Sequence, residues 1–476
     1  MRARIFAEET RKWLTLASVS VGLFMIMLDN TVVNVALPAI QDDLDTTLSQ
    51  LQWIVTGYAL TFAAFMLVGG KIADAYGRRL IFVVGIVIFT LASLACGLAG
   101  SGESLIAARV VQGVGAALMN PATLSIIAAT FPPARRGTAI GIWAGVSATA
   151  LAIGPLVGGL LTEHLSWNWI FFVNVPVGIV GIAASFLFID ESRDESHERL
   201  DLPGLATSGI GLFALTYGLI EANTYGWTST RIVGSFAVAA AALGSFALLE
   251  RHQRAPMLPL ELFRNRTYTG ANVVTLLVAL AMFGVFFFMS LYMQRILGYS
   301  AVQTGAAFLP MTILIILVAP VAGRTADRVG SRALMTAGMV LIAVQLLYLS
   351  RLGVESTFWT LLPGFVAGGI GMALTMTPSA AAATRSVPVD KAGVGAAVLN
   401  AFRQVGGSLG IALMGAIMAS ELGSTPTPAA FMRGFEHALL VAAGIALVGA
   451  VVAYVLVRPH AGAGGAAPQR APELAA

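Results

Sequence analysis

Fourteen apolar runs, each long enough to cross a lipid bilayer, follow one another along almost the whole chain. Only 11% of the 476 residues are charged and 57% are hydrophobic, whereas a soluble globular protein carries about a quarter charged residues. Runs of about 20 apolar residues predict membrane-spanning helices, because a helix satisfies its backbone polar groups without water. We therefore expect an all-α integral membrane protein. The predicted spans are 14–38, 51–70, 80–100, 104–130, 138–162, 168–189, 203–221, 231–250, 269–294, 302–322, 333–350, 357–377, 393–420 and 436–457.

The basic residues predict which side of the membrane holds the chain ends. An even number of spans places both termini on one side. If that side is the cytoplasm, the inner segments hold 22 Lys and Arg and the outer loops hold four, which is the bias that the positive-inside rule requires. Arg outnumbers Lys by 25 to three, which suggests a GC-rich bacterial genome. We expect a multi-pass protein of the bacterial cytoplasmic membrane, in contact with lipid, with both termini cytoplasmic. The basic residues are spread over short loops, so we expect no nucleic-acid partner.

The chain contains an internal repeat with an offset of about 253 to 256 residues. GKIADAYGRR (70–79) aligns with GRTADRVGSR (323–332), and QGVGAALMNPATL (112–124) aligns with GGIGMALTMTPSA (368–380). Chance similarity between apolar helices does not explain polar residues at matched spacing. Two halves of six spans therefore flank a helix pair at 203–250, and paired six-span halves around a midplane cavity are a transporter architecture.

These patterns predict six segments. The sequence DESRDESHERLD is charged on nearly every residue, and the Ala-, Gly- and Pro-rich end of the chain is expected to be disordered. The segments are a cytoplasmic N-terminus (1–12), an N-terminal six-helix bundle (13–189), a charged cytoplasmic linker (190–202), two extra linker helices with a loop (203–266), a C-terminal six-helix bundle (267–457) and a disordered cytoplasmic tail (458–476).

Three motifs in the first half resemble signatures of one transporter superfamily. GKIADAYGRR is similar to the signature between helices two and three of the major facilitator superfamily, although Ile72 replaces a usual Leu and Ala75 a usual basic residue. RVVQGVGAALMNP (109–121) resembles the fourth-helix signature. IGPLVGGLL (153–161) resembles the fifth-helix signature of antiporters, with Ala150 in place of a common Gly.

Two further segments, LDNTVVNVALP (28–38) and NAFRQVGGSLG (400–410), are similar to elements of the fourteen-span drug:proton antiporter branch. The resemblance extends from residue 13 to about 457. It implies a monomeric secondary transporter that exports drugs, antibiotics or other amphipathic small molecules in exchange for protons by alternating access. The proton gradient would be its energy source, with no cofactor.

Three charged side chains, Asp29, Arg109 and Arg403, lie inside predicted spans. Charge at membrane depth is costly and marks a functional site or an ion pair. Proton-driven transport needs a group that protonates inside the membrane, and Asp29 is the best candidate because no His lies at that depth. An adjacent Arg109 would oppose protonation. Alternatively, Asp29 forms a structural ion pair or a hydrogen bond with Asn30 or Thr31, and Arg109 extends to the outer interface.

Glycine, Asp and Arg residues recur on an inner loop of each half, where glycines allow tight turns and Asp74 can pair with Arg78. By resemblance these loops form a cytoplasmic gate, although a solvated turn would also explain the arginines. The gate residues are Gly70, Asp74, Gly77, Arg78, Arg79, Gly323, Asp327, Arg328, Gly330 and Arg332.

The fifth predicted span carries glycines at four-residue spacing. Such stripes let helices approach closely, and a proline bends a helix locally. The stripe begins with Gly137, Gly141 and Gly145, and by resemblance the antiporter motif that follows seals the cavity against leak. The residues of that motif are Gly154, Pro155, Gly158 and Gly159.

Polar residues line one face of the fourth span and of the thirteenth, and aromatic residues occupy spans that line the cavity in the resembling family. Aromatic walls suit bulky amphipathic ligands, although single aromatics are common in lipid-facing helices. The predicted substrate-cavity residues are Asn34, Tyr58, Phe62, Gln112, Asn120, Trp143, Phe286, Phe308, Asn400, Arg403 and Gln404, with Phe402 as a further aromatic candidate.

No catalytic or metal-binding motif is present in the sequence. GGSLG (406–410) matches a serine nucleophile elbow, but it lies in an apolar run without the strand–turn–helix context that this motif needs. We therefore expect neither an enzyme nor a metalloprotein, and no ATP hydrolysis in this chain. Two other functions stay open: proton-coupled import or export of one metabolite, and a membrane scaffold or sensor that transports nothing.

Overall fold

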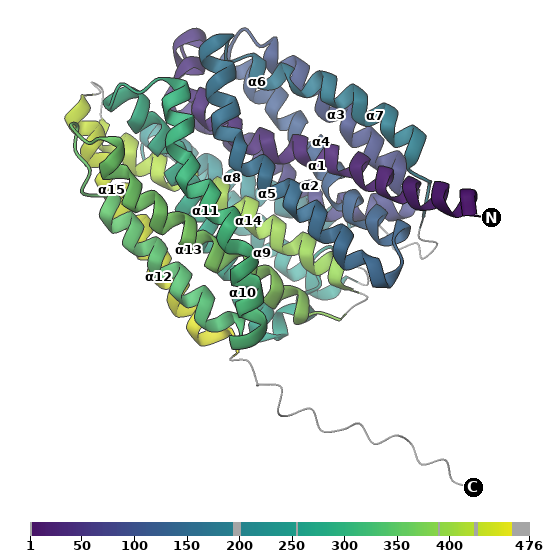
Figure 1. Cartoon of the computed structure of the whole chain (residues 1–476). Coiled ribbons are helices and arrows are strands. Elements are labelled where there is room, and N and C mark those ends of the chain that lie inside the picture. Colours follow the sequence, from purple (N-terminus) through teal and green to yellow (C-terminus); the bar gives the residue numbers. More distant parts are fainter. Residues whose placement is uncertain (1, 194–200, 254–255, 389–390, 423–426, 459–476) are drawn as a thin grey trace.

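The computed structural model describes residues 2–193, 201–253, 256–388, 391–422 and 427–458. Within these ranges every regular element is a helix, and fourteen helical spans are long and apolar enough to cross a membrane (Figure 1). Each overlaps one predicted span, so the predicted fold class is confirmed. Most of the charged linker and nearly all of the tail predicted to be disordered lie outside the described residues.

The helices that form the first half of the chain are α1 (Arg2–Leu44), α2 (Leu48–Tyr76), α3 (Arg78–Gly97), α4 (Gly102–Thr130), α5 (Pro133–His164), α6 (Trp169–Phe172) and α7 (Asn174–Phe188). The helices of the second half are η1 (Leu260–Arg264), α10 (Arg266–Leu291), the π-helix η2 (Tyr292–Ile296), α11 (Ala301–Val329), α12 (Ser331–Leu349), α13 (Phe358–Arg385), α14 (Ala392–Leu422) and α15 (Pro428–Leu456). Between the halves lie α8 (Leu202–Tyr225) and α9 (Thr230–His252). Several helices extend beyond the predicted spans, because backbone hydrogen bonding continues past the apolar part of a helix.

The two halves repeat one packing pattern. In the first half α2 and α3 pack on α4, and α1 packs on α5; in the second half α11 and α12 pack on α13, and α10 packs on α14. The turns after α2 and α11 match in detail, because Gly77 has φ 123° and Gly330 has φ 88°. Only glycine adopts such positive φ values without strain. The structure therefore contains two six-helix pseudo-repeats and two linker helices.

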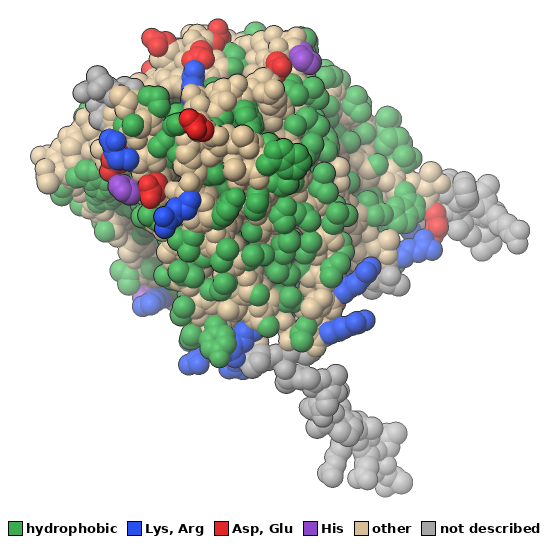
Figure 2. Space-filling model, turned by 60° about the vertical axis from the view of Figure 1, so that its left-hand side comes forward, with side chains coloured by type: hydrophobic (Ala, Val, Ile, Leu, Met, Phe, Trp, Pro, Cys, Tyr) green, Lys and Arg blue, Asp and Glu red, His purple; other side chains and the backbone are tan. Residues whose placement is uncertain are grey.

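Hydrophobic side chains cover the middle of the molecular surface in a broad band, and the charged side chains gather towards its two ends (Figure 2). This distribution fits a bundle whose sides contact lipid and whose ends contact water. We call the end that carries both chain termini the terminal end and the opposite one the far end.

Helix α8 packs against both halves, on α2 and on α14. Glu221 of α8 accepts hydrogen bonds from the Ser49 hydroxyl (2.6 Å) and the Trp53 indole (3.1 Å) of α2. Asn223, also of α8, donates a hydrogen bond to the carbonyl of Ala416 on α14 (2.6 Å). The linker helices therefore bridge the seam between α2 and α14.

Polar contacts close the far end between the halves. Arg295 forms an ion pair with Asp42 at 2.5 Å. Gln294 donates to the carbonyl of Val35 (2.9 Å), and the Val302 amide donates to the Glu163 carboxylate (2.8 Å). Since each contact joins one half to the other, all of them must break if this end opens.

The far halves of α5 and α11 touch through their glycines. A Cβ atom on Gly159 would lie 2.4 Å from the Ala301 carbonyl oxygen, and one on Gly305 would lie 2.2 Å from that of Pro155. Neither distance leaves room for a side chain. The predicted close packing of the motif around Pro155 is therefore present: Pro155 and Gly159 contact the other half, whereas Gly154 and Gly158 lie against α1 of the same half.

The other part of the predicted stripe makes no close contact. Around Gly137, Gly141 and Gly145 the space in which a Cβ atom would lie is empty to 4 Å, so the prediction of close helix approach was wrong at these three positions. Small side chains permit close approach without causing it, and here α5 stands clear of its neighbours towards the terminal end. The structure is thus closed at the far end and separated along α5 at the terminal end.

This contrast gives a matched pair of variants on one helix. Gly159→Ala is expected to destabilise the closed far end by about 1–3 kcal/mol, the usual effect of overpacking. Gly141→Ala adds the same methyl group in open space and should not. Spin labels at the exposed Leu165 and Val354, introduced as cysteines after replacement of Cys96 by Ala, would report the separation of the two halves. Longer label distances are expected for Gly159→Ala alone, and equal distances in both variants would contradict the packing argument.

Candidate functional site

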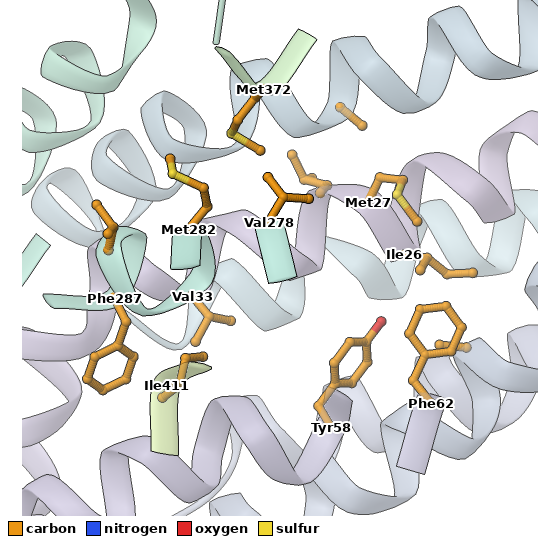
Figure 3. Close-up of a cluster of buried hydrophobic side chains, with 14 of the residues drawn as sticks. Ile26, Met27, Val33, Tyr58, Phe62, Val278, Met282, Phe287, Met372 and Ile411 are labelled. Carbon is orange, nitrogen blue, oxygen red and sulfur yellow. The ribbon is translucent and has the colours of Figure 1, made fainter. Parts of the chain in front are cut away.

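A cavity of about 160 Å³ lies between the two halves. Helices α1, α2, α4 and α5 line it from the first half, and α10, α11, α13 and α14 from the second. Met27 and Val33 of α1, Tyr58 of α2, Met372 of α13 and Ile411 of α14 belong to its wall, and Figure 3 shows these side chains coming from different helices towards a common centre. The polar lining residues are Asn30, Thr31, Asn34, Tyr58, Arg109, Thr312, Arg403 and Gln404. The cavity is therefore mostly apolar with a few convergent polar groups, as ligand sites are.

Asp29 and Arg109 form a buried ion pair beside the cavity. The Arg109 Nη1 donates to Asp29 Oδ2 at 2.5 Å, and both side chains are at most 1% exposed. Gln112 donates from Nε2 to the other carboxylate oxygen (3.0 Å) and accepts from Arg109 at Oε1 (2.7 Å). Both carboxylate oxygens of Asp29 therefore accept charge-assisted hydrogen bonds from within the first half.

Helix packing fixes Arg109 in this position. Its Nε donates to the carbonyl of Ile54 on α2 (3.1 Å), and its guanidinium lies 4.2 Å from the centre of the Tyr58 ring. The alternative in which Arg109 extends to the outer interface is therefore wrong in this structure. So is the hydrogen bond of Asp29 with Asn30 or Thr31, since both side chains bond to backbone carbonyls of α1 instead.

Arg403 lines the cavity from the opposite half. Among the described residues it forms neither a hydrogen bond nor an ion pair, and its Nε is buried without an acceptor. The adjacent Gln404 also lines the cavity, and its Nε2 is likewise buried without an acceptor. The second half therefore presents unsatisfied donors to the cavity, whereas in the first half Asp29 balances the charge of Arg109.

The cavity wall contains some of the predicted substrate residues, namely Asn34, Tyr58, Phe286, Arg403 and Gln404. Other predicted residues stand behind the wall or away from it. Phe62 packs behind Tyr58, and Phe308 packs between Phe286 and Phe365. The residues that do not line the cavity are Phe62, Gln112, Asn120, Trp143, Phe308, Asn400 and Phe402.

The predicted gate residues form contacts within their own halves. As expected, Arg78 donates from Nε to Asp74 at 2.7 Å, and the Glu191 carboxylate accepts from the amide of Arg79 (3.0 Å) at the start of α3. In the second half Asp327 pairs with Arg385 at the end of α13. Each of these contacts lies within one half, and the role of the loops as a gate stays a prediction.

The contacts of the other gate residues also lie within their own halves. The guanidinium of Arg332 lies 3.9 Å from the centre of the Tyr454 ring, and Arg328 is exposed. A Cβ atom on Gly70 or Gly323 would lie in ordinary contact with the neighbouring helix, at 3.4 and 3.5 Å.

Sequence reasoning missed much of the apolar wall and the polar contacts of the far end. Thr312 of α11 lines the cavity and donates to the carbonyl of Ala152 in the other half (3.2 Å), and no motif marks it. A signal for the Arg295–Asp42 pair was available, because the first outer loop holds three acids and no base. Opposite charges on outer loops of the two halves could have suggested that these loops meet.

Two repeats of six membrane helices around a shared central cavity define a multi-pass membrane transporter, not an enzyme. The family model described as Major Facilitator Superfamily matches residues 19–410 and, in a second alignment, 271–475. The chain therefore belongs to the major facilitator superfamily.

Curated relatives of the chain are resistance and export proteins. The chain is 38% identical to the tetracenomycin C resistance and export protein of Streptomyces glaucescens, over 87% of this chain and 77% of that protein. It is 38% identical to a puromycin resistance protein of Streptomyces alboniger, over 94% and 92% of the two chains. It is 36% identical to the multidrug resistance protein Stp of Mycobacterium tuberculosis, over 87% and 77%.

Solved structures share the fold. The POT family transporter PepTSo superposes with a TM-score of 0.69 at 15% identity, over 94% of this chain and 98% of that one. A bacterial homologue of the human lysosomal transporter Spinster superposes with a TM-score of 0.63 at 17% identity, over 94% and 97%.

Proposed function

We propose that this protein exports amphipathic small molecules from the cytoplasm in exchange for protons, by alternating access of the central cavity. The observation that carries the proposal is the Asp29–Arg109 ion pair, which is fully buried at membrane depth beside the cavity. Relatives named for antibiotic resistance and export also support the proposal. The positive-inside bias supports a cytoplasmic position for the terminal end.

In this orientation the structure corresponds to the cytoplasm-open state. The far end is closed by the Arg295–Asp42 pair and by the contact of Gly159 with Ala301. A substrate enters from the terminal end and occupies the cavity between the halves. The halves then rock, so that the far-end contacts break and the terminal end closes, and the substrate leaves outside.

The proton takes the opposite route. In the outward-open state Arg109 moves away from Asp29, and the carboxylate binds a proton from outside. The transporter returns to the cytoplasm-open state with Asp29 protonated. There the ion pair with Arg109 forms again, and the proton is released to the cytoplasm. Proton release and formation of the ion pair thus occur together. The substrate-free transporter therefore returns to the cytoplasm-open state only when it carries a proton inwards.

The proton gradient supplies enough free energy for this exchange. A proton that crosses 100 mV releases about 2.3 kcal/mol, which sustains a roughly fifty-fold concentration ratio of a neutral substrate. No ATP is needed for a gradient of this size.

A drug-susceptibility panel on a bacterial strain that expresses the gene tests this function. We expect tolerance of several amphipathic compounds to rise, and a proton uncoupler to abolish the efflux of each compound. Improved growth on one metabolite, with unchanged drug tolerance, would instead support a specific metabolite transporter. No transport of any kind at normal membrane expression would support a scaffold and contradict the proposal.

A further inference from the structure

The charge of Arg403 has no opposite charge beside it among the residues that the structure describes. Its Nε is buried and bonds to nothing, and among the described residues the whole guanidinium makes no hydrogen bond and no ion pair. A guanidinium does not lose its proton under any physiological condition. Arg403 is only partly exposed and lines the cavity, and a charge in such a setting without a partner is unfavourable, so this group favours an acceptor that the described residues do not provide.

The side chain next to Arg403 also lacks a hydrogen-bond acceptor. Gln404 lines the same cavity and has a buried Nε2 without an acceptor. Two neighbouring groups on one turn of α14 therefore offer donors to the cavity. Donors that converge in this way without an acceptor favour a ligand that carries oxygen atoms with negative charge.

The charge balance of the cavity points in the same direction. Its described lining contains two arginines and no carboxylate. Arg109 is neutralised by Asp29, whose side chain is fully buried and does not belong to the wall. One positive charge remains, at Arg403. A cationic ligand would therefore be repelled, and an anionic one attracted, in a low-dielectric setting that strengthens both effects.

The surroundings of Arg403 suit the apolar part of such a ligand. Gly407 lies one turn further along α14, and a Cβ atom there would lie 2.2 Å from the Phe283 ring. The absence of a side chain thus lets Phe283 lie against α14 near the guanidinium. Phe283, Phe286 and Met376 all line the cavity, so an acidic group at Arg403 would have an aromatic and thioether wall for its hydrophobic body.

We propose that Arg403 and Gln404 form an anion subsite and that the cavity selects amphipathic compounds with one acidic group, such as a carboxylate or a phenolate. The inference rests on the proposed export function, since it specifies the class of substrate for the same cavity. In this arrangement Arg403 determines specificity and Asp29 with Arg109 serves the proton. The second half of the protein thus selects the substrate, and the first half binds the proton.

Three dansyl probes of similar size and different charge test the subsite: dansylglycine (a carboxylate), dansylglycinamide (neutral) and N-(2-aminoethyl)dansylamide (an ammonium). Each is titrated into the purified full-length protein in lipid nanodiscs, and binding is followed by dansyl fluorescence. The wild-type protein is expected to bind the carboxylate about tenfold more tightly than the amide, and the ammonium most weakly. Tenfold corresponds to about 1.4 kcal/mol, close to the lower end of the range for hydrogen bonds to charged groups.

The variants separate charge from structure. Arg403→Gln is expected to reduce the carboxylate-to-amide preference to about one while the amide Kd stays within about twofold. Arg403→Lys should keep most of the preference, because it keeps the charge. Arg351→Gln removes an arginine from an exposed loop outside the cavity and should leave all three Kd values unchanged.

Two results would overturn the subsite. One is equal or tighter binding of the ammonium probe by the wild-type protein. The other is an equal loss of affinity for all three probes in Arg403→Gln, which indicates a structural role. Uncoupler-sensitive transport of the probes into inverted vesicles tests the proposed export separately. If the probes bind as expected but are not transported, the subsite is supported and export is contradicted. If the probes are transported equally well by the wild-type protein and Arg403→Gln, export is supported and the subsite is contradicted.

Discussion

Replacing Asp29 with Asn is expected to abolish proton-coupled efflux while substrate binding remains. Asn is nearly isosteric and its one side-chain oxygen can still accept from Arg109 or from Gln112, which now donate to different oxygens of Asp29, but it cannot take up a proton at neutral pH. The substrate concentration ratio across the membrane should fall from as much as about fifty-fold, the limit set by one proton at 100 mV, to one. Equilibrium exchange of substrate should continue, because the cavity wall is unchanged.

The measurement uses inverted vesicles that contain a pH-sensitive dye. Addition of substrate to wild-type vesicles should release protons from the lumen, and addition to Asp29→Asn vesicles should not. Asp45→Asn is the matched control, because Asp45 is exposed after α1 and lies outside the cavity wall. Normal proton coupling in Asp29→Asn at wild-type expression would exclude Asp29 as the proton carrier and leave it a structural ion pair.

Replacing Arg109 with Gln is expected to lower the stability of the protein strongly. The Asp29 carboxylate would stay buried with only neutral partners, and removal of one member of a buried ion pair costs about 3–5 kcal/mol. Contacts with the Ile54 carbonyl and the Tyr58 ring would be lost as well. We expect reduced expression and a markedly lower midpoint of thermal unfolding in detergent.

A double variant separates stability from coupling. Asp29→Asn combined with Arg109→Gln removes both charges, so most of the lost stability should return although proton coupling stays absent. The stability of the double variant is therefore expected to exceed that of Arg109→Gln alone. A double variant as unstable as the single one would show that Arg109 acts mainly through packing and not through charge.

The spans and the repeat were predictable from sequence because they depend on local composition and spacing. The thickness of the bilayer sets the length of an apolar run. Gly77 and Gly330 mark equivalent turns, and glycine at these positions already suggests their positive φ values. The deep position of Asp29 was also predictable, since α1 is apolar on either side of it. These features need no knowledge of which helices touch.

Contacts between helices were not predictable in the same way. Asp29 and Arg109 are 80 residues apart, and their meeting depends on how α1 and α4 are rotated about their axes. The same limit explains why Tyr58 lines the cavity while Phe62, one turn along the same helix, stands behind it. It also explains the error at Gly141, where a small residue allowed contact but no neighbour is there.

The position of α8 makes the two seams between the halves unequal. On one side Glu221 and Asn223 hold α8 against α2 and α14, so the linker helices shield that seam from lipid. On the other side α5 and α11 meet only in their far parts, and α5 is bare around Gly141. With the terminal end in the cytoplasm, as proposed, we expect hydrophobic compounds in the cytoplasmic leaflet to enter the cavity laterally between α5 and α11, directly from the bilayer.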